Sequence, residues 1–544
     1  MAKSVQIMVD SEQIELGDAR IVEPQRVAAS SSGMVATAHF SATEAGRQVL
    51  QQGGNAIDAA VAAAIALGVC EPAASGLGGQ TMMLIHLAQP RRTFPLGGSP
   101  RAQNRTTQEF FAEKKTRLHG HAATTVPSTL AVCDYARRNY GTKPLDELLQ
   151  PAIRLAEDGY PVSALQNKLT RRELKKLKAG TAGPLFLKEG ARARPIGSQF
   201  KQPVLAETLR RIANCGSEDF YRGQIAQMIH DDMQTHGGLL HKDDLALVPE
   251  PVERRPVTCR FGSLRVITFP PPGAGRTLVE MLNILDQFSP EQRDPDTPAG
   301  AVLLAATIRQ AFLDRRDRPF DPNLYQQVDE KRMLSTEYAT EVAARLRKKL
   351  KPPKRIKTSG ETTHLSVMDR HGNAVALTQS IERVYGSFAA SPSLGFLYNN
   401  YMSAFEYEDI GHPYYLRPNG VPWASVAPTI VFRGRRPWLA IGSPGSERIA
   451  PSIVQVLLRL DRQSPYDAVA APRLFCSING EVSFEAARMR DDIPFALENH
   501  GMTVRPRDPY SFYLGCVQAV MYQDKTFIGV ADPRRDGAAG GPKL

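Results

Sequence analysis

The sequence predicts a layered α/β sandwich, because strand-like and helix-like segments mix along the whole chain of 544 residues. Two segments give the clearest signals: an alanine-rich helix at 55–69, and a β-hairpin pattern around Asp369–Gly372. A helical bundle would lack the strands, and an all-β fold would lack the helices. With 42% hydrophobic and 23% charged residues, the composition is typical of a folded globular protein and excludes a mainly disordered or fibrous chain.

The individual elements follow from periodicity and turn signals. Ser41 stands three residues before Glu44, a spacing that predicts a reciprocal cap for the first helix. The glycine loop 75–80 follows a helix and precedes a strand, so its order does not match the dinucleotide-binding fingerprint. The stretch 349–360 combines prolines and charges without an apolar period, which is typical of a linker. Helices are predicted at 41–53, 55–69, 128–140, 144–158, 204–237 (two helices), 275–288, 449–460 and 493–498, and strands at 34–39, 82–87, 362–368, 373–378, 428–432, 438–441 and 516–521.

The net charge of +11 is concentrated in one short segment. Between Glu341 and Gly360 there are eight basic residues and one acidic residue, which accounts for +7 of the total. From Thr362 to the C-terminus the balance is only +1. Because the excess is local and is not interleaved with aromatic residues, we expect no nucleic-acid partner.

Membrane, export and metal signals are weak. The longest unbroken apolar stretch is the nine residues 59–67, against about 20 for a membrane-spanning helix, so we expect no membrane partner. Asp10, Glu12 and Glu15 occupy the region where a secretory signal needs an apolar run, which predicts a cytoplasmic protein. The six cysteines are scattered, with no C-x-x-C pair and no histidine at metal-ligand spacing, so we expect reduced thiols and no metal.

The junction between the linker and the hairpin holds a candidate nucleophile. If the Glu361–Thr362 bond were cut, Thr362 would have a free α-amino group beside its own hydroxyl. The ordinary pKa of such an amine is about 7.7 to 8.0, so the amine could accept the hydroxyl proton during attack on an amide. A threonine pair that opens a strand is also common without this role, and the spacing alone favours that simpler interpretation.

A set of motifs covers the chain from about Met34 to Arg534 and resembles the γ-glutamyltransferase (γ-glutamyltranspeptidase) family. The combination of a Thr-Thr-His-x-Ser block with a Gly-Ser-Pro-Gly block is its most specific part. The motifs are Gly53–Ala60, Glu71–Pro72, Ser75–Gly79, Tyr140–Thr142, Thr362–Val367, Gly372–Val375, Asn399–Asn400, Pro428–Val431, Gly442–Gly445 and Ala531–Arg534.

The resemblance implies an N-terminal-nucleophile hydrolase fold, a four-layer αββα sandwich. Members are made as one precursor that cuts itself, which here implies fragments 1–361 and 362–544 interlocked in one αββα domain. A heterodimer of the two fragments is therefore expected, while any higher oligomer stays open. The resemblance implies neither a metal nor an organic cofactor.

The resemblance also implies the catalytic residues. Thr362 would be the nucleophile, and Ser380 takes the place of a second hydroxyl that contacts it. The backbone N–H groups of Gly445 and Ser446 would form the oxyanion site, where a fixed donor contributes about 3 to 4 kcal/mol. His364 follows the threonine pair, but a general base there is unnecessary if the α-amine serves.

The substrate pocket departs from the family pattern. Leu96 stands where the family has an arginine for the γ-glutamyl carboxylate, although Arg101 or Arg105 could substitute. A family serine pair becomes Ala424–Ser425, with only Ser425 kept. On the amine side, the matching positions are Glu382, Tyr401 and Ala404. These changes favour a different acyl group over a shifted pose of the same one.

The sequence therefore predicts a threonine amidohydrolase or acyltransferase acting on a small amide. The acyl part would be γ-glutamyl or a related group, oxamate-like amides included, and water or an amine would accept it. The alternative is a non-catalytic relative that keeps the fold as a binding or scaffold protein.

Overall fold

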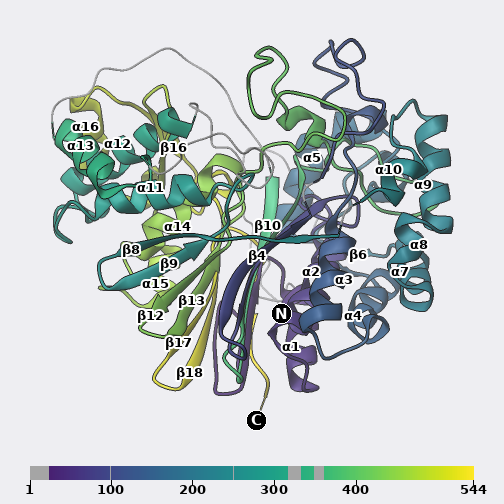
Figure 1. The fold of residues 1–544 in the computed structure, drawn as a ribbon, viewed down its shortest axis with the longest axis horizontal. Coiled ribbons are helices and arrows are strands. Elements are labelled where there is room, and N and C mark those ends of the chain that lie inside the picture. The colour runs from purple at the N-terminus through teal and green to yellow at the C-terminus, as the bar shows by residue number, and fades with distance from the viewer. Residues whose placement is uncertain (1–23, 99, 249, 316–331, 348–360, 544) are drawn as a thin grey trace, which may run out of the picture.

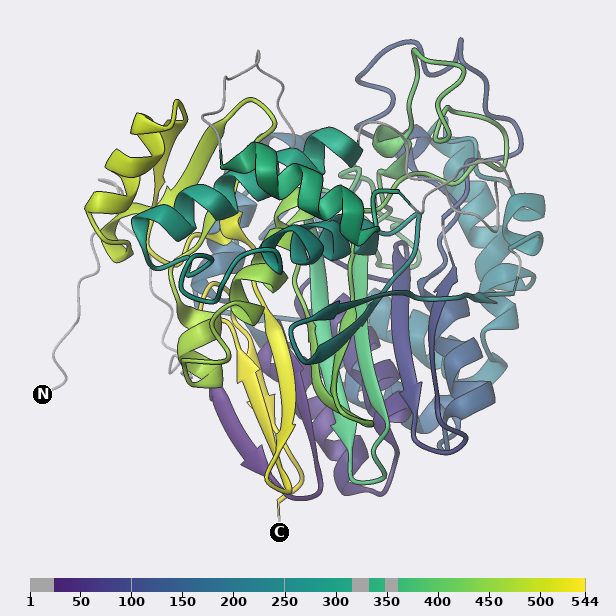
Figure 2. The ribbon, with the colours of Figure 1, turned by 60° about the vertical axis from the view of Figure 1, so that its left-hand side comes forward.

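Two β-sheets lie face to face at the centre of the molecule, and helices cover the outer face of each (Figures 1 and 2). The computed structural model describes residues 24–98, 100–248, 250–315, 332–347 and 361–543, without the side chain of Glu361. The predicted linker 349–360 lies outside the described residues. The four layers confirm the predicted α/β class and the αββα arrangement.

Each central sheet has seven strands within the described residues, and every pair is antiparallel. The first sheet runs β19 (Ala538–Gly540), β2 (Gly33–Thr37), β10 (Glu361–Asp369), β11 (Ala374–Glu382), β3 (Gln80–Leu87), β4 (Arg92–Gly98), β7 (Val252–Glu253). The second runs β1 (Val27–Ser30), β18 (Thr526–Ala531), β17 (Gln518–Gln523), β13 (Arg436–Gly442), β12 (Thr429–Arg433), β9 (Leu264–Thr268), β8 (Val257–Phe261). Smaller sheets pair β14 (Leu474–Cys476), β15 (Glu481–Glu485) and β16 (Thr503–Arg507), and β5 (Tyr160–Pro161) with β6 (Gln199–Phe200).

The helices form the two outer layers. Those on the side of the first sheet are α1 (Phe40–Gln51), α2 (Ala56–Cys70), α3 (Thr129–Tyr140), α4 (Leu145–Asp158), α5 (Ala164–Ala179), α6 (Gly183–Phe186), α7 (Pro203–Cys215), α8 (Glu218–Tyr221), α9 (Gln224–Thr235) and α10 (Lys242–Ala246). On the other side lie α11 (Gly275–Leu285), α12 (Pro298–Asp314), α13 (Thr336–Leu346), α14 (Ile449–Leu457), α15 (Pro465–Ala470) and α16 (Asp492–Asn499). No described helix is long and apolar enough to cross a membrane.

The alanine-rich helix α2 packs directly on the central strands β10 and β11. Its small side chains allow this close approach, and almost every residue of the helix is buried. A capping box fixes its start: Asn55 Oδ1 accepts from the Asp58 N–H at 3.0 Å, and an Asp58 carboxylate oxygen accepts from the Asn55 N–H at 2.9 Å. The helix therefore forms where the sequence predicted it.

The cap of α1 differs from the prediction. Ser41 does not cap this helix, because the helix already begins at Phe40 and the His39 ring accepts the N–H of Ser41 at 3.2 Å. The Glu44 carboxylate does not reach back to the start of the helix but accepts hydrogen bonds from Arg47, one helical turn further along. A histidine ring nitrogen thus performs the capping role that the serine spacing suggested.

Side-chain alternation on the hairpin β10–β11 separates two cores. One face of β10 packs on helix α2 and its neighbours through Leu365 and Val367. The opposite face packs on the second sheet through His364, Ser366 and Met368. Even-numbered residues of both hairpin strands therefore face the seam between the sheets.

The two expected fragments interleave in both sheets. Residues before 362 supply β2, β3, β4 and β7 to the first sheet and β1, β8 and β9 to the second, and later residues supply the other strands. Strand β10 itself pairs with β2, and β18 pairs with β1. Neither fragment therefore contains a complete central sheet.

Candidate active site

Thr362 lies at the start of the central strand β10 and is 5% exposed. By alternation its side chain belongs to the seam between the sheets, on the same face as His364. The ladder to β11 shifts between Glu361 and Thr363, and Thr363 pairs with Gln379. Continuing that register by one residue puts Thr362 opposite Ser380. The structure thus brings the two predicted hydroxyl residues to neighbouring positions.

A buried hydrogen-bonded cluster surrounds Ser380. Its Oγ accepts the N–H of Glu382 at 2.8 Å, and its hydroxyl is hydrogen-bonded to that of Tyr401. Gln80 Nε2 donates to the same Tyr401 hydroxyl. Ser380 and Gln80 are register partners on β11 and β3. Gln80 is a residue that the sequence analysis missed, and its only signal was its place directly after the glycine loop.

Glu382 ends strand β11 in a left-handed backbone conformation, with φ of 76°. Burial of its carboxyl group raises the pKa to about 7, and the charge of Arg383 opposes this shift. The Glu382 charge and burial in turn raise the pKa of Tyr401, with burial the larger cause. This site therefore contains a carboxyl group that changes charge near neutral pH.

The Gly445–Ser446 turn follows the end of β13. Its two residues have positive φ values of 121° and 54°, so successive N–H groups can point to one side of the chain. Within the described residues neither N–H donates a hydrogen bond. The Ser443 hydroxyl, two residues before the turn, accepts the N–H of Cys516 at 2.9 Å and so connects the turn to the segment before β17. This arrangement offers two donors for an anionic oxygen.

His364 connects the strand of Thr362 to this turn. Its ring packs so closely on Gly442 that a Cβ there would lie 2.2 Å from the ring. The ring nitrogens contact the hydroxyls of Thr378 and Ser366 at 2.8 and 3.1 Å, and burial lowers the pKa of His364 to about 3. A neutral, fully bonded imidazole is a packing group between the sheets, as the sequence analysis expected.

The proposed substitutes for the family arginine behave differently. Leu96 is fully buried in the core beneath the helices, so its side chain points away from the seam. Arg105 is half-exposed and forms an ion pair with Asp243 at 2.9 Å, so its guanidinium group is already paired at the surface. The Arg101 carbonyl accepts the N–H of Val126 beside Thr125, which itself binds the Asn399 side chain. The backbone of Arg101 therefore lies near the segment that holds Tyr401.

The remaining predicted pocket positions lie on two loops. Ser425 is partly exposed and lies four residues before the start of β12, while its neighbour Ala424 is buried in the core between the second sheet and its helices. The Ala424 N–H donates to the carbonyl of Pro272, so a proline loop braces this serine. Ala404 is partly exposed at the end of the short turn that begins at Tyr401.

Glu71 joins the region behind the nucleophile to the C-terminal part of the chain. Its carboxylate accepts a hydrogen bond from the Thr363 hydroxyl and forms an ion pair with Arg535 at 2.5 Å. Arg535 is almost fully buried. The sequence analysis noted the Glu71–Pro72 motif without assigning it a role, and this contact gives it one.

One group of potential metal ligands occurs in the described residues. Asp232 lies 3.2 Å from His121 Nε2 and 3.1 Å from His236 Nδ1. The two rings stack at 4.4 Å with an interplanar angle of 10°, and a ligated ion must lie in the plane of each ring. Nearly parallel, separated planes cannot share one ion, so this cluster is a hydrogen-bonded unit with Tyr398, which donates to Asp232 at 2.8 Å.

The four-layer fold is that of the N-terminal-nucleophile hydrolases, and comparison with known proteins agrees. The structure superposes on a cephalosporin acylase from Bacillus halodurans with a TM-score of 0.87, at 28% identity, covering 99% of this chain and 100% of that one. The gamma-glutamyltranspeptidase family profile matches residues 42–541. The chain belongs to the γ-glutamyltranspeptidase family, whose enzymes are amidohydrolases and transferases of this type.

Two curated relatives span almost the same length. The glutathione hydrolase proenzyme of Escherichia coli (strain K12) is 32% identical over 93% of this chain and 91% of its own length. The acylase ACY 1 proenzyme of Pseudomonas sp. (strain V22) is also 32% identical, over 94% of both chains. The chain is therefore equally similar to a relative named for glutathione and to one named as an acylase.

Proposed function

We propose that this protein is a self-processing threonine amidohydrolase and acyltransferase, with Thr362 as its nucleophile. The observation that supports this best is the position of Thr362, which is buried at the start of β10 beside the Thr363–Gln379 pair, while Ser380 directly follows Gln379 on β11. The Gly445–Ser446 turn lies at the end of β13, which packs across the seam from β10. A nucleophile, a second hydroxyl and two N–H donors are thus available at one end of the seam.

Maturation would use the same groups as catalysis. The Thr362 hydroxyl attacks the carbonyl carbon of Glu361, the C–N bond breaks, and an ester joins Glu361 to the Thr362 side chain. Water hydrolyses this ester, which leaves the Glu361 carboxylate and a free Thr362 amine. The products are fragments 1–361 and 362–544, held as a heterodimer by their shared sheets.

In turnover the Thr362 amine takes the proton of its own hydroxyl as the oxygen attacks a substrate amide. The N–H groups of Gly445 and Ser446 donate to the developing oxyanion, and Ser380 accepts or donates a hydrogen bond at the nucleophile oxygen. The amine then protonates the leaving nitrogen, and an acyl ester remains on Thr362. Water or an amine acceptor resolves this ester.

The acyl group is proposed to differ from free γ-glutamyl. Leu96 cannot offer a guanidinium group, Arg105 is ion-paired elsewhere, and Ala424 and Ala404 have no polar side chain. Glu382, Tyr401, Ser425 and Arg101 are the proposed contacts for the acyl part. Candidate donors are small amides, oxamate-like amides included, whose acyl part lacks the α-amino-acid pair of γ-glutamyl or carries it differently, and glutathione should be a poor donor.

Mass analysis of the purified protein tests the maturation step. We expect a chain that starts at Thr362, and we expect Thr362→Ala to remain one intact chain because it has no hydroxyl to attack Glu361. A different new N-terminus, or cleavage in Thr362→Ala, would refute the assignment. An intact wild-type chain without amidase activity would favour the scaffold alternative.

A donor screen tests the acyl group. Glutathione and a series of small amides are compared by kcat/KM with processed protein. An unpaired buried charge costs roughly 3 to 5 kcal/mol, so glutathione should fall short of the best donor by two or more powers of ten. Glutathione as the best donor would refute the altered pocket and point to Arg101 as the carboxylate partner.

A further inference from the structure

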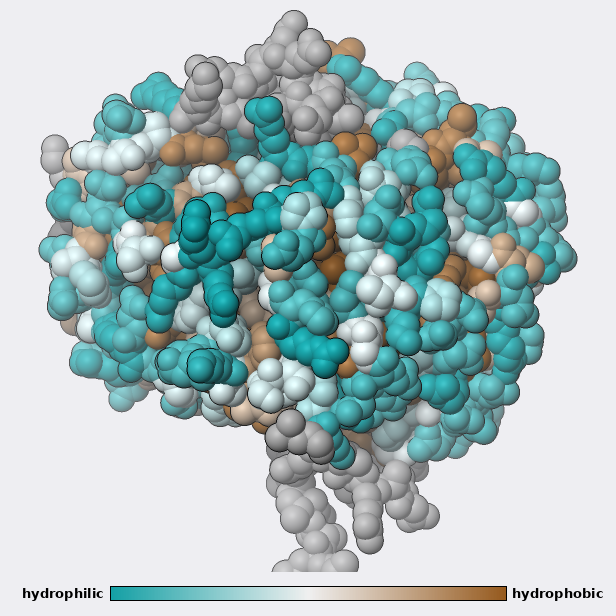
Figure 3. Space-filling model, turned by 60° about the horizontal axis from the view of Figure 1, so that its bottom comes forward, coloured by the Kyte–Doolittle hydropathy of each residue, from teal (hydrophilic) through white to brown (hydrophobic). Residues whose placement is uncertain are grey.

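A second concave site lies at the opposite end of the seam from Thr362. It is a cavity of about 300 Å³ between the hairpin ends of the two central sheets. Strand β10 separates it from Thr362, and eight residues of extended chain correspond to about 26 Å. Figure 3 shows the face that carries these hairpin ends, on which hydrophilic atoms predominate. The cavity is therefore distinct from the proposed active site.

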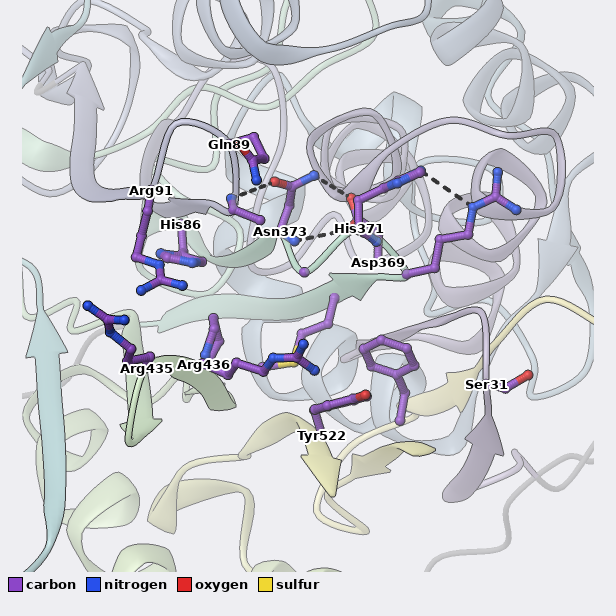
Figure 4. Close-up of a pocket in the computed structure, with 16 residues that line it drawn as sticks. Ser31, His86, Gln89, Arg91, Asp369, His371, Asn373, Arg435, Arg436 and Tyr522 are labelled. Atoms are coloured by element: carbon purple, nitrogen blue, oxygen red, sulfur yellow. Dashed lines mark hydrogen bonds between the residues drawn. The ribbon is translucent and has the colours of Figure 1, made fainter. Parts of the chain in front are cut away.

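Four arginines from both sheets line this cavity. Arg91 and Arg370 come from hairpins of the first sheet, and Arg435 and Arg436 come from the β12–β13 hairpin of the second. In Figure 4, Arg91 and His86 face Arg435 and Arg436 across the opening. Guanidinium groups on two opposing walls can donate hydrogen bonds to an anionic ligand from both sides.

The described residues provide no acidic partner for these four groups. None of the four forms an ion pair with a described carboxylate. The carboxylate of Asp369 lies in the lining, but it accepts the N–H groups of Ala56, His371 and Asn373 at 2.9 to 3.0 Å, so it braces the turn. By contrast, the neighbouring Arg92, which does not line the cavity, forms an ion pair with Glu253 at 3.0 Å.

The walls of the cavity are firmly held. Asn373 Oδ1 accepts the N–H of Ala88 at 3.0 Å, which ties the β10–β11 turn to the β3–β4 turn. Tyr522 and Phe527 pack ring to ring at 4.8 Å on the other wall. His86 bonds to Thr93, and burial together with Arg91 and Arg265 lowers its pKa to about 4. These contacts fix the turns and rings that form the walls, and the four exposed arginine side chains extend from this framework.

We propose that this cavity binds a small multivalent anion, one with phosphoryl groups or several carboxylates. Two walls of guanidinium groups favour a ligand with at least two separated negative groups, because each group can bind one wall in bidentate fashion. The cavity volume suits a small molecule. The inference does not depend on the proposed function of Thr362.

Calorimetric titration of the full-length protein with pyrophosphate and with citrate, at constant ionic strength, tests this proposal. We expect saturable binding of at least one probe at one site per chain. Arg435→Gln/Arg436→Gln should weaken it at least tenfold, and Arg91→Gln, on the other wall, should weaken it as well. Preference for pyrophosphate or for citrate would identify the anion as phosphoryl or polycarboxylate.

A matched control has the same change in net charge away from the cavity. Arg192→Gln/Arg490→Gln removes two exposed arginines that pair with Glu189 and Asp492, and its binding should equal that of the wild type. Circular dichroism and melting without the probe confirm that each variant is folded. Absence of saturable binding of both probes, or equal weakening by the control, would overturn the proposal.

Discussion

Glu382 has a carboxyl group that the fold disfavours in its charged form. Its pKa is about 7 instead of 4.5, so its contribution to stability is complete below pH 4.5 and is lost as the pH rises through 7. Glu382→Gln removes this titration. We expect the variant to be more stable than the wild type by about 3 kcal/mol at pH 8.5, and no more stable at pH 4.5.

Urea unfolding at the two pH values measures this difference. Glu109→Gln, at an exposed position, is the control and should show no such dependence on pH. A Glu382→Gln variant that is equally or less stable at pH 8.5 would show that the charged form of Glu382 is well accommodated in the folded protein.

Glu71 illustrates a contact that reaches across the proposed fragments. Glu71→Ala removes the carboxylate that both Thr363 and Arg535 contact, and loss of one partner from a buried ion pair costs about 3 kcal/mol. Denaturant unfolding should show this loss, and Glu71→Gln should retain part of the stability through Thr363. A loss of less than 1 kcal/mol for Glu71→Ala would mean that other groups compensate Arg535.

At the residue scale, sequence patterns predicted positions better than partners. The family motifs indicated Thr362 and Ser380, and the structure places these two on the neighbouring strands β10 and β11, each next to a residue of the Thr363–Gln379 pair. The engagement of Arg105 with Asp243 could not be predicted, because the two residues are far apart in the sequence. Gln80 was missed for the same reason, since its bond to Tyr401 depends on the packing of a distant loop.

At the scale of elements, β13 and β10 come into close contact where Gly442 packs on the His364 ring. A Cβ at Gly442 would lie within 2.2 to 2.6 Å of three atoms of the His364 ring. Gly442→Ala should therefore force the sheets apart and lower the free energy of unfolding by about 1 to 3 kcal/mol. Thermal denaturation measures this effect, and Gly411→Ala is the control because only one side-chain atom lies near that position.

An unchanged melting temperature for Gly442→Ala would show that the His364 ring can move aside at no cost. Because the same joint connects Thr362 to the Gly445–Ser446 turn, we also expect Gly442→Ala to slow the self-cleavage proposed above. Gly411→Ala should leave it unchanged.

The elements that the sequence predicted are those with a strong period. Helix α2 and strand β10 occur within one residue of their predicted bounds, and β11 starts one residue later and ends four residues later than predicted. Strands β8 and β9 were not predicted, because arginines interrupt their apolar pattern. Helix α5 was missed as well, since only Leu169, Thr170 and Leu177 of its residues are buried.

For the whole molecule, the interleaved sheets predict that the cleaved protein stays together. Both fragments supply strands to both sheets, so separation would break the β2–β10 and β1–β18 ladders and expose two cores. Size-exclusion chromatography of the cleaved protein should give one species containing both fragments, which separate only in denaturant. Separate elution under native conditions would contradict this arrangement.

The sequence predicted the fold class but could not predict the strand order. Alternation and periodicity identify strands one by one, whereas β19 lies beside β2 and β18 beside β1, from opposite ends of the chain. Such long-range pairs leave no local signal. The four-layer arrangement was therefore available only through the resemblance to a known family.

The close approach of the two ends of the described chain has one more consequence. The Ala539 N–H donates to the carbonyl of Gln25 at 2.9 Å, and Arg26 binds the carbonyl of Gly537 at 2.7 Å. A circular permutant is therefore feasible, with a short linker that joins these ends and a new start at Thr362. Once its initiator methionine is removed, such a protein would have the free threonine amine from synthesis onward, with no cut in the chain.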